Sequence, residues 1–104
     1  RSVVGIRSRV GPGTRVRNSL LLGADYYESL EEIDHAHAKG LPPVGVGSDC
    51  VIGRAIVDKN SRVGNGVRIA NEAGVQEADG DGYYIRDGIV IVPKSGVIPD
   101  GTVI

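Results

Sequence analysis

The chain has 104 residues, of which 40% are hydrophobic, and its formal net charge is −1. It contains four Tyr but no Trp and no Phe, so these values predict a single domain with a core of aliphatic side chains. The near-neutral charge and the lack of any apolar run of about eighteen residues argue against nucleic acid and against a membrane as partners.

The N-terminal quarter separates basic from acidic residues. The sequence lacks Met and opens on Arg1 without a recognisable targeting segment, so we expect a fragment or a processed product. No acid precedes Asp25, and a cluster of acids then follows. The basic residues are Arg1, Arg7, Arg9, Arg15 and Arg17, and the acidic ones are Asp25, Glu28, Glu31, Glu32 and Asp34.

Aliphatic residues recur every six positions along most of the chain. This period predicts an all-β parallel β-helix of hexapeptide repeats, a three-sided prism in which about eighteen residues close one coil. An antiparallel sandwich would instead show period two with turn signals every eight to twelve residues, as a rough guide. The three aliphatic runs are Val4, Val10, Val16 and Leu22; Val57, Val63, Ile69 and Val75; and Ile85, Ile91, Val97 and Val103. The step from Ile52 to Val57 is only five, which predicts a tightened corner or a register slip.

Two segments interrupt the repeat within one domain spanning residues 1–104. In the segment at about 25–43, Ser29 and Glu32 form a capping box, which predicts a short helix. Its expected apolar face comprises Leu30, Ile33 and His37, and Gly40, Pro42 and Pro43 mark its end. The segment at about 71–84 has no clear period and is expected to be a loop whose Tyr83 and Tyr84 pack back onto the prism.

Residues with catalytic potential are sparse. His35 and His37 are two residues apart and therefore on different faces of the expected helix, so we expect a structural role and neither a metal site nor a general base. Cys50 rules out an internal disulfide, is typical of a reducing compartment, and falls at an inward position of the core. The GNG segment at 64–66 is expected to be a corner, because no helix with Lys follows it. We therefore expect no catalytic residue, metal ligand or cofactor in this chain.

Several segments resemble the C-terminal domain of glucose-1-phosphate adenylyltransferase, over essentially the whole chain. They are SVVGIRSRV, GADYYES, IVDKNSRVG, GVQEADGDGYYIRDGIVIVPKSG and PDGTVI. The resemblance implies a left-handed parallel β-helix that regulates and assembles an enzyme. That enzyme makes ADP-glucose and pyrophosphate from ATP and glucose 1-phosphate for glycogen or starch synthesis. Its Mg²⁺ and its catalytic residues belong to an N-terminal nucleotidyltransferase domain that lies outside this chain.

The resemblance also implies partners. These are the enzyme's own N-terminal domain, the other subunits of a homo- or hetero-tetramer, and anionic metabolites such as 3-phosphoglycerate, which activates, and phosphate, which inhibits. The location implied is the bacterial cytoplasm or the plastid stroma. Because a prism exposes unpaired strand edges at its ends, we expect the N-terminal domain to cap the first coil.

The resemblance implies an anion-binding site at Lys59 and Lys94, with Asp58 beside the first lysine. Their separation is two residues shorter than is usual in the family, and the shortening falls in ADGDGYY. Guanidinium groups also bind oxyanions, so we expect a contribution from Arg7, Arg9, Arg15 and Arg17. The alternatives are that the lysines are ordinary solvated surface residues, that the chain is a free-standing hexapeptide acyltransferase, or that it is a structural spacer.

Overall fold

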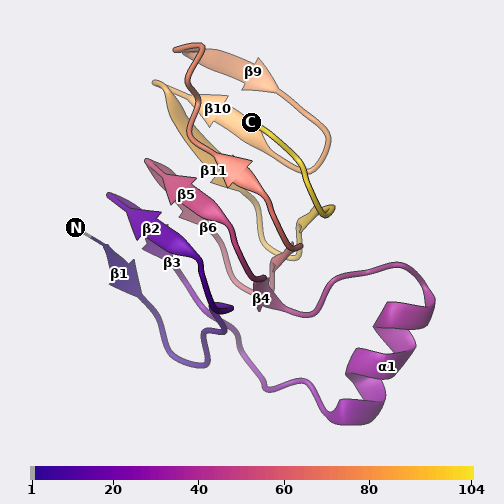
Figure 1. The fold of residues 1–104 in the computed structure, drawn as a ribbon. Helices are drawn as coiled ribbons and strands as arrows, with labels where there is room; N and C mark the ends of the chain where they lie inside the picture. Colours follow the sequence, from indigo (N-terminus) through magenta and orange to yellow (C-terminus); the bar gives the residue numbers. More distant parts are fainter. Residues whose placement is uncertain (1) are drawn as a thin grey trace.

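Among residues 2–104, which the computed structural model describes, short strands wind into a prism and one helix lies beside it; the strands number twelve (Figure 1). Arg1 lies outside the described residues. No helix in this part of the chain has the length and apolar character to cross a membrane. The strands are β1 (Val3–Val4), β2 (Arg15–Arg17), β3 (Leu20–Leu21), β4 (Gly45–Val46), β5 (Val51–Gly53), β6 (Ala55–Val57), β7 (Arg62–Val63), β8 (Arg68–Ile69), β9 (Glu77–Asp79), β10 (Tyr84–Arg86), β11 (Ile89–Val92) and β12 (Val97–Ile98), and the helix is α1 (Leu30–Ala38).

The strands form three sheets, one for each side of the prism. The first sheet has the order β1-β3-β6-β11-β10-β9, the second β12-β7-β4 and the third β2-β5-β8. From β1 to β8, successive strands along the chain fall in different sheets, and strands one coil apart pair in parallel, as β3 does with β6 and β6 with β11. The prediction of a parallel β-helix is therefore confirmed, with an antiparallel addition at β9 and β10.

Inward-pointing aliphatic residues stack directly across the coils. In the first sheet the Cα partners run from Val4 to Leu21, Val57 and Val92. In the second sheet they run from Val10 to Val46, Val63 and Ile98, and in the third from Val16 to Ile52 and Ile69. These columns fill the narrow interior, because β-strand side chains alternate between the two faces and every second residue points inward.

The register of two aliphatic runs was predicted wrongly. The buried member of β3 is Leu21 and not Leu22, because the corner after Val16 is one residue shorter than six. The same shortening between Ile52 and Val57 was predicted and is confirmed by the strand pairing. In the last run Ile85 is buried as predicted, but the later positions are shifted by one residue, since the fully buried residues are Val92 and Ile98 while Val103 is 73% exposed. A shift of one residue moves a side chain to the opposite face of a strand.

The segment at 71–84 is not a loop throughout. It carries β9, and with β10 and β11 it forms an antiparallel meander that extends the first sheet. Asn71 starts this excursion with a buried side chain whose amide donates to the carbonyl oxygens of Val75 and Gly88. Tyr83 packs against the core as predicted, whereas Tyr84 is exposed beneath the guanidinium of Arg86.

The predicted helix and its capping box are confirmed, but its predicted packing face is wrong. The Ser29 hydroxyl accepts from the amide of Glu32, and the Glu32 carboxylate accepts from the amide of Ser29. Leu30 is 82% exposed, and Ala36 is the buried residue of α1. The helix lies beside the prism rather than in it (Figure 1), so a short amphipathic pattern did not identify the side that packs.

A nearly buried ion pair ties the helical excursion back to the prism. Glu28 stands just before α1, and one of its carboxylate oxygens accepts from the amide of Val44 at 2.6 Å. The other oxygen lies 3.0 Å from Nη2 of Arg62, in β7, and the two side chains are 6% and 19% exposed. Arg62 also donates to the carbonyl oxygen of Pro42. We call this arrangement the Glu28 clasp; it fixes both ends of the excursion to the second sheet.

Cys50, the segment 64–66 and the two histidines lie in different parts of the fold. Cys50 is completely buried and its thiol donates to the carbonyl oxygen of Gly64 at 3.1 Å, which confirms the core position. The segment 64–66 forms the corner between β7 and β8, as predicted. His35 and His37 are both exposed on α1.

Candidate anion site

Lys59 and Lys94 lie in adjacent coils at equivalent corner positions. Each is the second residue after an inward residue of the first sheet, Val57 or Val92, and these two are Cα partners. The amide of Ser95 donates to the carbonyl oxygen of Lys59 at 2.9 Å, which pins one corner to the other. The lysines are 35 positions apart in the sequence, yet the coil repeat brings their backbones to within about one strand spacing, roughly 4.8 Å.

Asp25 is a member of this site that the sequence analysis did not identify. It comes from the preceding coil, four residues after Leu21. Its Oδ1 lies 3.3 Å from Nζ of Lys59, and its Oδ2 lies 3.8 Å from Nζ of Lys94. The side chains are 46% exposed for Asp25, 49% for Lys59 and 61% for Lys94, so water reaches all three. Asp25 could have been identified from the sequence, because it follows the same corner one coil earlier.

Asn60 holds Asp25 in position. Its side-chain amide nitrogen donates to Oδ2 of Asp25 at 3.2 Å, and its side-chain oxygen accepts from the Asp25 amide at 3.0 Å. Asn60 has φ 61, a left-handed conformation that Asn tolerates better than most residues. The hydrogen bond from Asn60, followed by that from Lys59, lowers the pKa of the Asp25 carboxyl below its ordinary value.

A glycine determines how the chain reaches this site. Gly23 occupies the corner position that Lys59 and Lys94 occupy in later coils, and it has φ 78. A Cβ there would collide with the carbonyl oxygen of Ile6, so the close approach of the two coils requires glycine. The chain then leaves the corner and carries Asp25 toward the lysines.

Asp58 stabilises the corner through hydrogen bonds with the backbone. Its Oδ1 accepts from the amide of Lys59 at 2.7 Å, and its own amide donates to the carbonyl oxygen of Val92 at 2.9 Å. These contacts orient the backbone from which Lys59 projects. Asp58 therefore belongs to the frame of the site.

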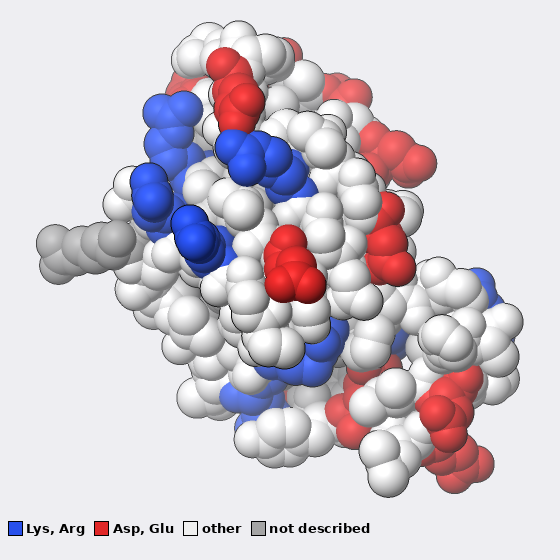
Figure 2. Space-filling model, viewed as in Figure 1, with Lys and Arg blue, Asp and Glu red and all other residues white. Residues whose placement is uncertain are grey.

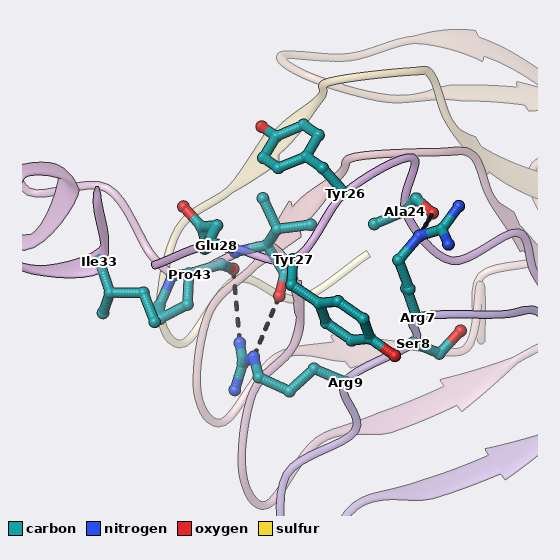
Figure 3. A pocket seen from close by; sticks show the side chains of 10 residues that line it. Arg7, Ser8, Arg9, Ala24, Tyr26, Tyr27, Glu28, Ile33 and Pro43 are labelled. Atoms are coloured by element: carbon teal, nitrogen blue, oxygen red, sulfur yellow. Dashed lines mark hydrogen bonds between the residues drawn. The ribbon is translucent and has the colours of Figure 1, made fainter. Parts of the chain in front are cut away.

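Arg7 and Arg9 lie near the same corner, in the first coil. Nε of Arg7 donates to the carbonyl oxygen of Ala24 at 2.9 Å, next to Asp25. Arg9 donates to the carbonyl oxygens of Val44 and Pro43, and burial lowers the pKa of its guanidinium. Both arginines line a cavity of about 290 Å³. In Figure 3 the segment leading to α1 forms one side of this cavity, with Tyr26, Tyr27 and Glu28 among the lining residues.

Arg15 and Arg17 are not brought together with the lysines. Both are exposed on β2, at the edge of the third sheet, whereas Lys59 and Lys94 follow strands of the first sheet. Figure 2 shows basic side chains gathered over β2 and β5, and acidic side chains on α1 at the opposite end of the view. The expected group of four arginines is thus divided between two faces of the prism.

The corner brings two ammonium groups from adjacent coils to one carboxylate. Two ammonium groups converge on a pair of carboxylate oxygens, which is the arrangement that a phosphate or carboxylate ligand requires. Within the described range 2–104, no cluster of three or more His, Cys, Asp or Glu residues could hold a metal ion.

The chain matches the model of a known protein family over nearly its whole length. The model of the family described as the GLGC left-handed parallel beta-helix domain matches residues 1–103. The match covers nearly the whole chain and includes every residue of the corner formed by Asp25, Lys59, Asn60 and Lys94.

Proposed function

Because the chain belongs to the family of the GLGC left-handed parallel β-helix domain, the C-terminal domain of glucose-1-phosphate adenylyltransferase, we propose that it regulates and assembles that enzyme. In this proposal the chain supplies no catalytic group. Synthesis of ADP-glucose and pyrophosphate from ATP and glucose 1-phosphate, with Mg²⁺, takes place in an N-terminal domain. The β-helix binds an anionic metabolite such as 3-phosphoglycerate or phosphate and changes the activity of that domain.

The convergence of Lys59 and Lys94 is the observation that supports this function best. Two unrelated surface lysines would not be expected to approach the same carboxylate, and Lys59 and Lys94 are 35 positions apart in the sequence. Here the coil repeat places their ammonium groups 3.3 and 3.8 Å from the two oxygens of a single carboxylate. A phosphoryl or carboxylate group has oxygens in a similar arrangement, so the same cations can bind it.

Arg7 can add to this site from the coil below. Its Nε is committed to Ala24, and this bond directs the guanidinium toward the segment that carries Asp25. Guanidinium nitrogens donate in a planar fork that suits oxyanions, so Arg7 would bind a second group of a larger metabolite. Arg9 is engaged with two backbone carbonyls and serves mainly to hold the connecting segment.

The first coil supports the proposal that this domain packs against the rest of the enzyme. Val4 and Val10 occupy inward positions but are 51% and 40% exposed, whereas their counterparts Leu21 and Val46 are buried. Val3 and Ile6 are also exposed beside them. Burial of exposed aliphatic groups lowers the free energy of the system. We propose that the N-terminal domain, or another subunit of the tetramer, covers them.

The Lys94→Ala variant of the full-length enzyme tests the effector site. Removal of one of two cations should raise the 3-phosphoglycerate concentration for half-maximal activation about five- to thirtyfold, since a hydrogen bond to a charged group contributes roughly 1–2 kcal/mol when partly exposed. The rate without effector should stay unchanged. Lys39→Ala, which removes an exposed lysine at the end of α1, is the matched control. Unchanged activation of the Lys94 variant would refute the proposal.

A further inference from the structure

We propose that Asp25 is a built-in competitor that occupies the anion position between Lys59 and Lys94 and must be displaced before an external anion binds. This inference rests on the proposed function of the two lysines and adds the way in which that site is regulated. In this inference Asp25 sets the anion concentration above which the site becomes occupied.

The geometry of Asp25 is that of a bound ligand. Each of its two carboxylate oxygens approaches a different lysine, Oδ1 toward Lys59 and Oδ2 toward Lys94. A phosphate or sulfate ion that bridged the same ammonium groups would place two of its oxygens where those of Asp25 now lie. The carboxylate and the external anion therefore cannot occupy the position together.

Asp25 is well placed to compete and also able to leave. Its backbone is fixed by the bond from its amide to the side chain of Asn60, so the carboxylate stays near the lysines at an effective concentration on the order of millimolar or above. Its side chain is nevertheless 46% exposed, and rotation into water breaks the hydrogen bond from the Asn60 side chain and removes the carboxylate from both ammonium groups. Competition therefore requires only the movement of a side chain.

The charge of Asp25 weakens the binding of an external anion to the two lysines. With Asp25 in place the two lysines present a net charge near +1 to the solvent, and without it they present +2. A carboxylate that remained beside the bound anion would repel it, so both displacement and repulsion weaken binding. The site should then respond only when the anion is abundant, and removal of the Asp25 charge should lower that threshold.

The test is a calorimetric titration of the full-length protein with sodium sulfate at constant ionic strength. Asp25→Asn keeps the shape of the side chain and an oxygen that can accept from Asn60, but it removes the charge. Two exposed ion pairs of ordinary strength predict that sulfate binds about three- to tenfold more tightly to this variant. Asp34→Asn makes the same chemical change at an exposed position of α1 and should alter the affinity less than about twofold. Lys94→Ala identifies the heat that comes from this site.

The outcomes separate this inference from the function on which it rests. If Lys94→Ala weakens sulfate binding but Asp25→Asn leaves it equal or weaker, the anion site stands and Asp25 is not a competitor. If Lys94→Ala has no effect, the anion site itself is refuted, whatever Asp25→Asn does. Tighter binding by both aspartate variants to the same degree would show a general charge effect and would also overturn the inference. A circular dichroism spectrum of each variant confirms that the fold is retained.

Discussion

Glu28→Ala should destabilise the domain far more than the loss of an exposed carboxylate. Removing one partner of a fully buried ion pair costs about 3–5 kcal/mol. The partner Arg62 is 19% exposed and keeps its bond to Pro42, so we expect the free energy of unfolding to fall by about 2–3 kcal/mol. For a domain of this size that loss lowers Tm by about 10–20 °C. The amide of Val44 also loses its acceptor and should exchange its hydrogen faster.

Urea unfolding followed by circular dichroism measures the first effect, and hydrogen exchange observed by NMR measures the second. Glu72→Ala is the matched control, because Glu72 also pairs with an arginine, Arg68, but its side chain is 68% exposed. The control should lose no more than about 1 kcal/mol. If Glu28→Ala and Glu72→Ala were destabilised equally, the clasp would not hold the excursion to the prism, and the reasoning from burial would be refuted.

Two further predictions concern the core register and the response to acid. Ile98→Ala should lower the free energy of unfolding by about 2–5 kcal/mol, and Val97→Ala by less than about 1 kcal/mol, in urea titrations; equal losses would contradict the observed register. The folded-state pKa of Asp25 is lowered, so its contribution to stability is present above the unfolded pKa, about 3.9, and disappears as pH falls through the folded pKa. Asp25→Asn should therefore lose less stability than the unmodified protein below about pH 4, as measured by the urea midpoint at each pH. If the two proteins lost stability equally in acid, the contribution assigned to Asp25 would be wrong.

The repeat was predictable from sequence because it is encoded in local spacing. Val57, Val63 and Ile69 each fall six residues after the last, and all three are buried at successive sheets of one coil. The capping box at Ser29 was predictable for the same reason, since both of its bonds join residues three positions apart. Local patterns of this kind need no knowledge of the rest of the fold.

The errors came from features that only the closed coils determine. A hexapeptide period does not by itself say which of two adjacent aliphatic residues points inward, as Val97 and Ile98 show. The hairpin of β9 and β10 extends the first sheet through the pairing of β10 with β11, a contact that the hexapeptide period does not encode.

The functional corner was predictable only in part. Lys59 and Lys94 came from the family resemblance, but nothing in the spacing showed that Asp25 would stand between them. That position follows from the corner at Gly23, which diverts the chain toward the later coils. Arg15 and Arg17 were grouped with the site because they are near Arg9 in sequence, whereas a prism separates residues that are one side apart.

The antiparallel hairpin bears on whether such prisms can polymerise end to end. A stack of parallel coils is a template, because its last strand offers the same hydrogen-bonding edge as every strand before it. At the C-terminal end of the first sheet, β10 and β9 cover the edge of β11 (Figure 1); β10 runs against β11, and β9 again runs in the direction of β11. The outermost strand then presents the acidic side chains of Glu77 and Asp79. A further coil that docked on this side would have to pair with a strand that carries two exposed carboxylates, so charge disfavours filament growth there.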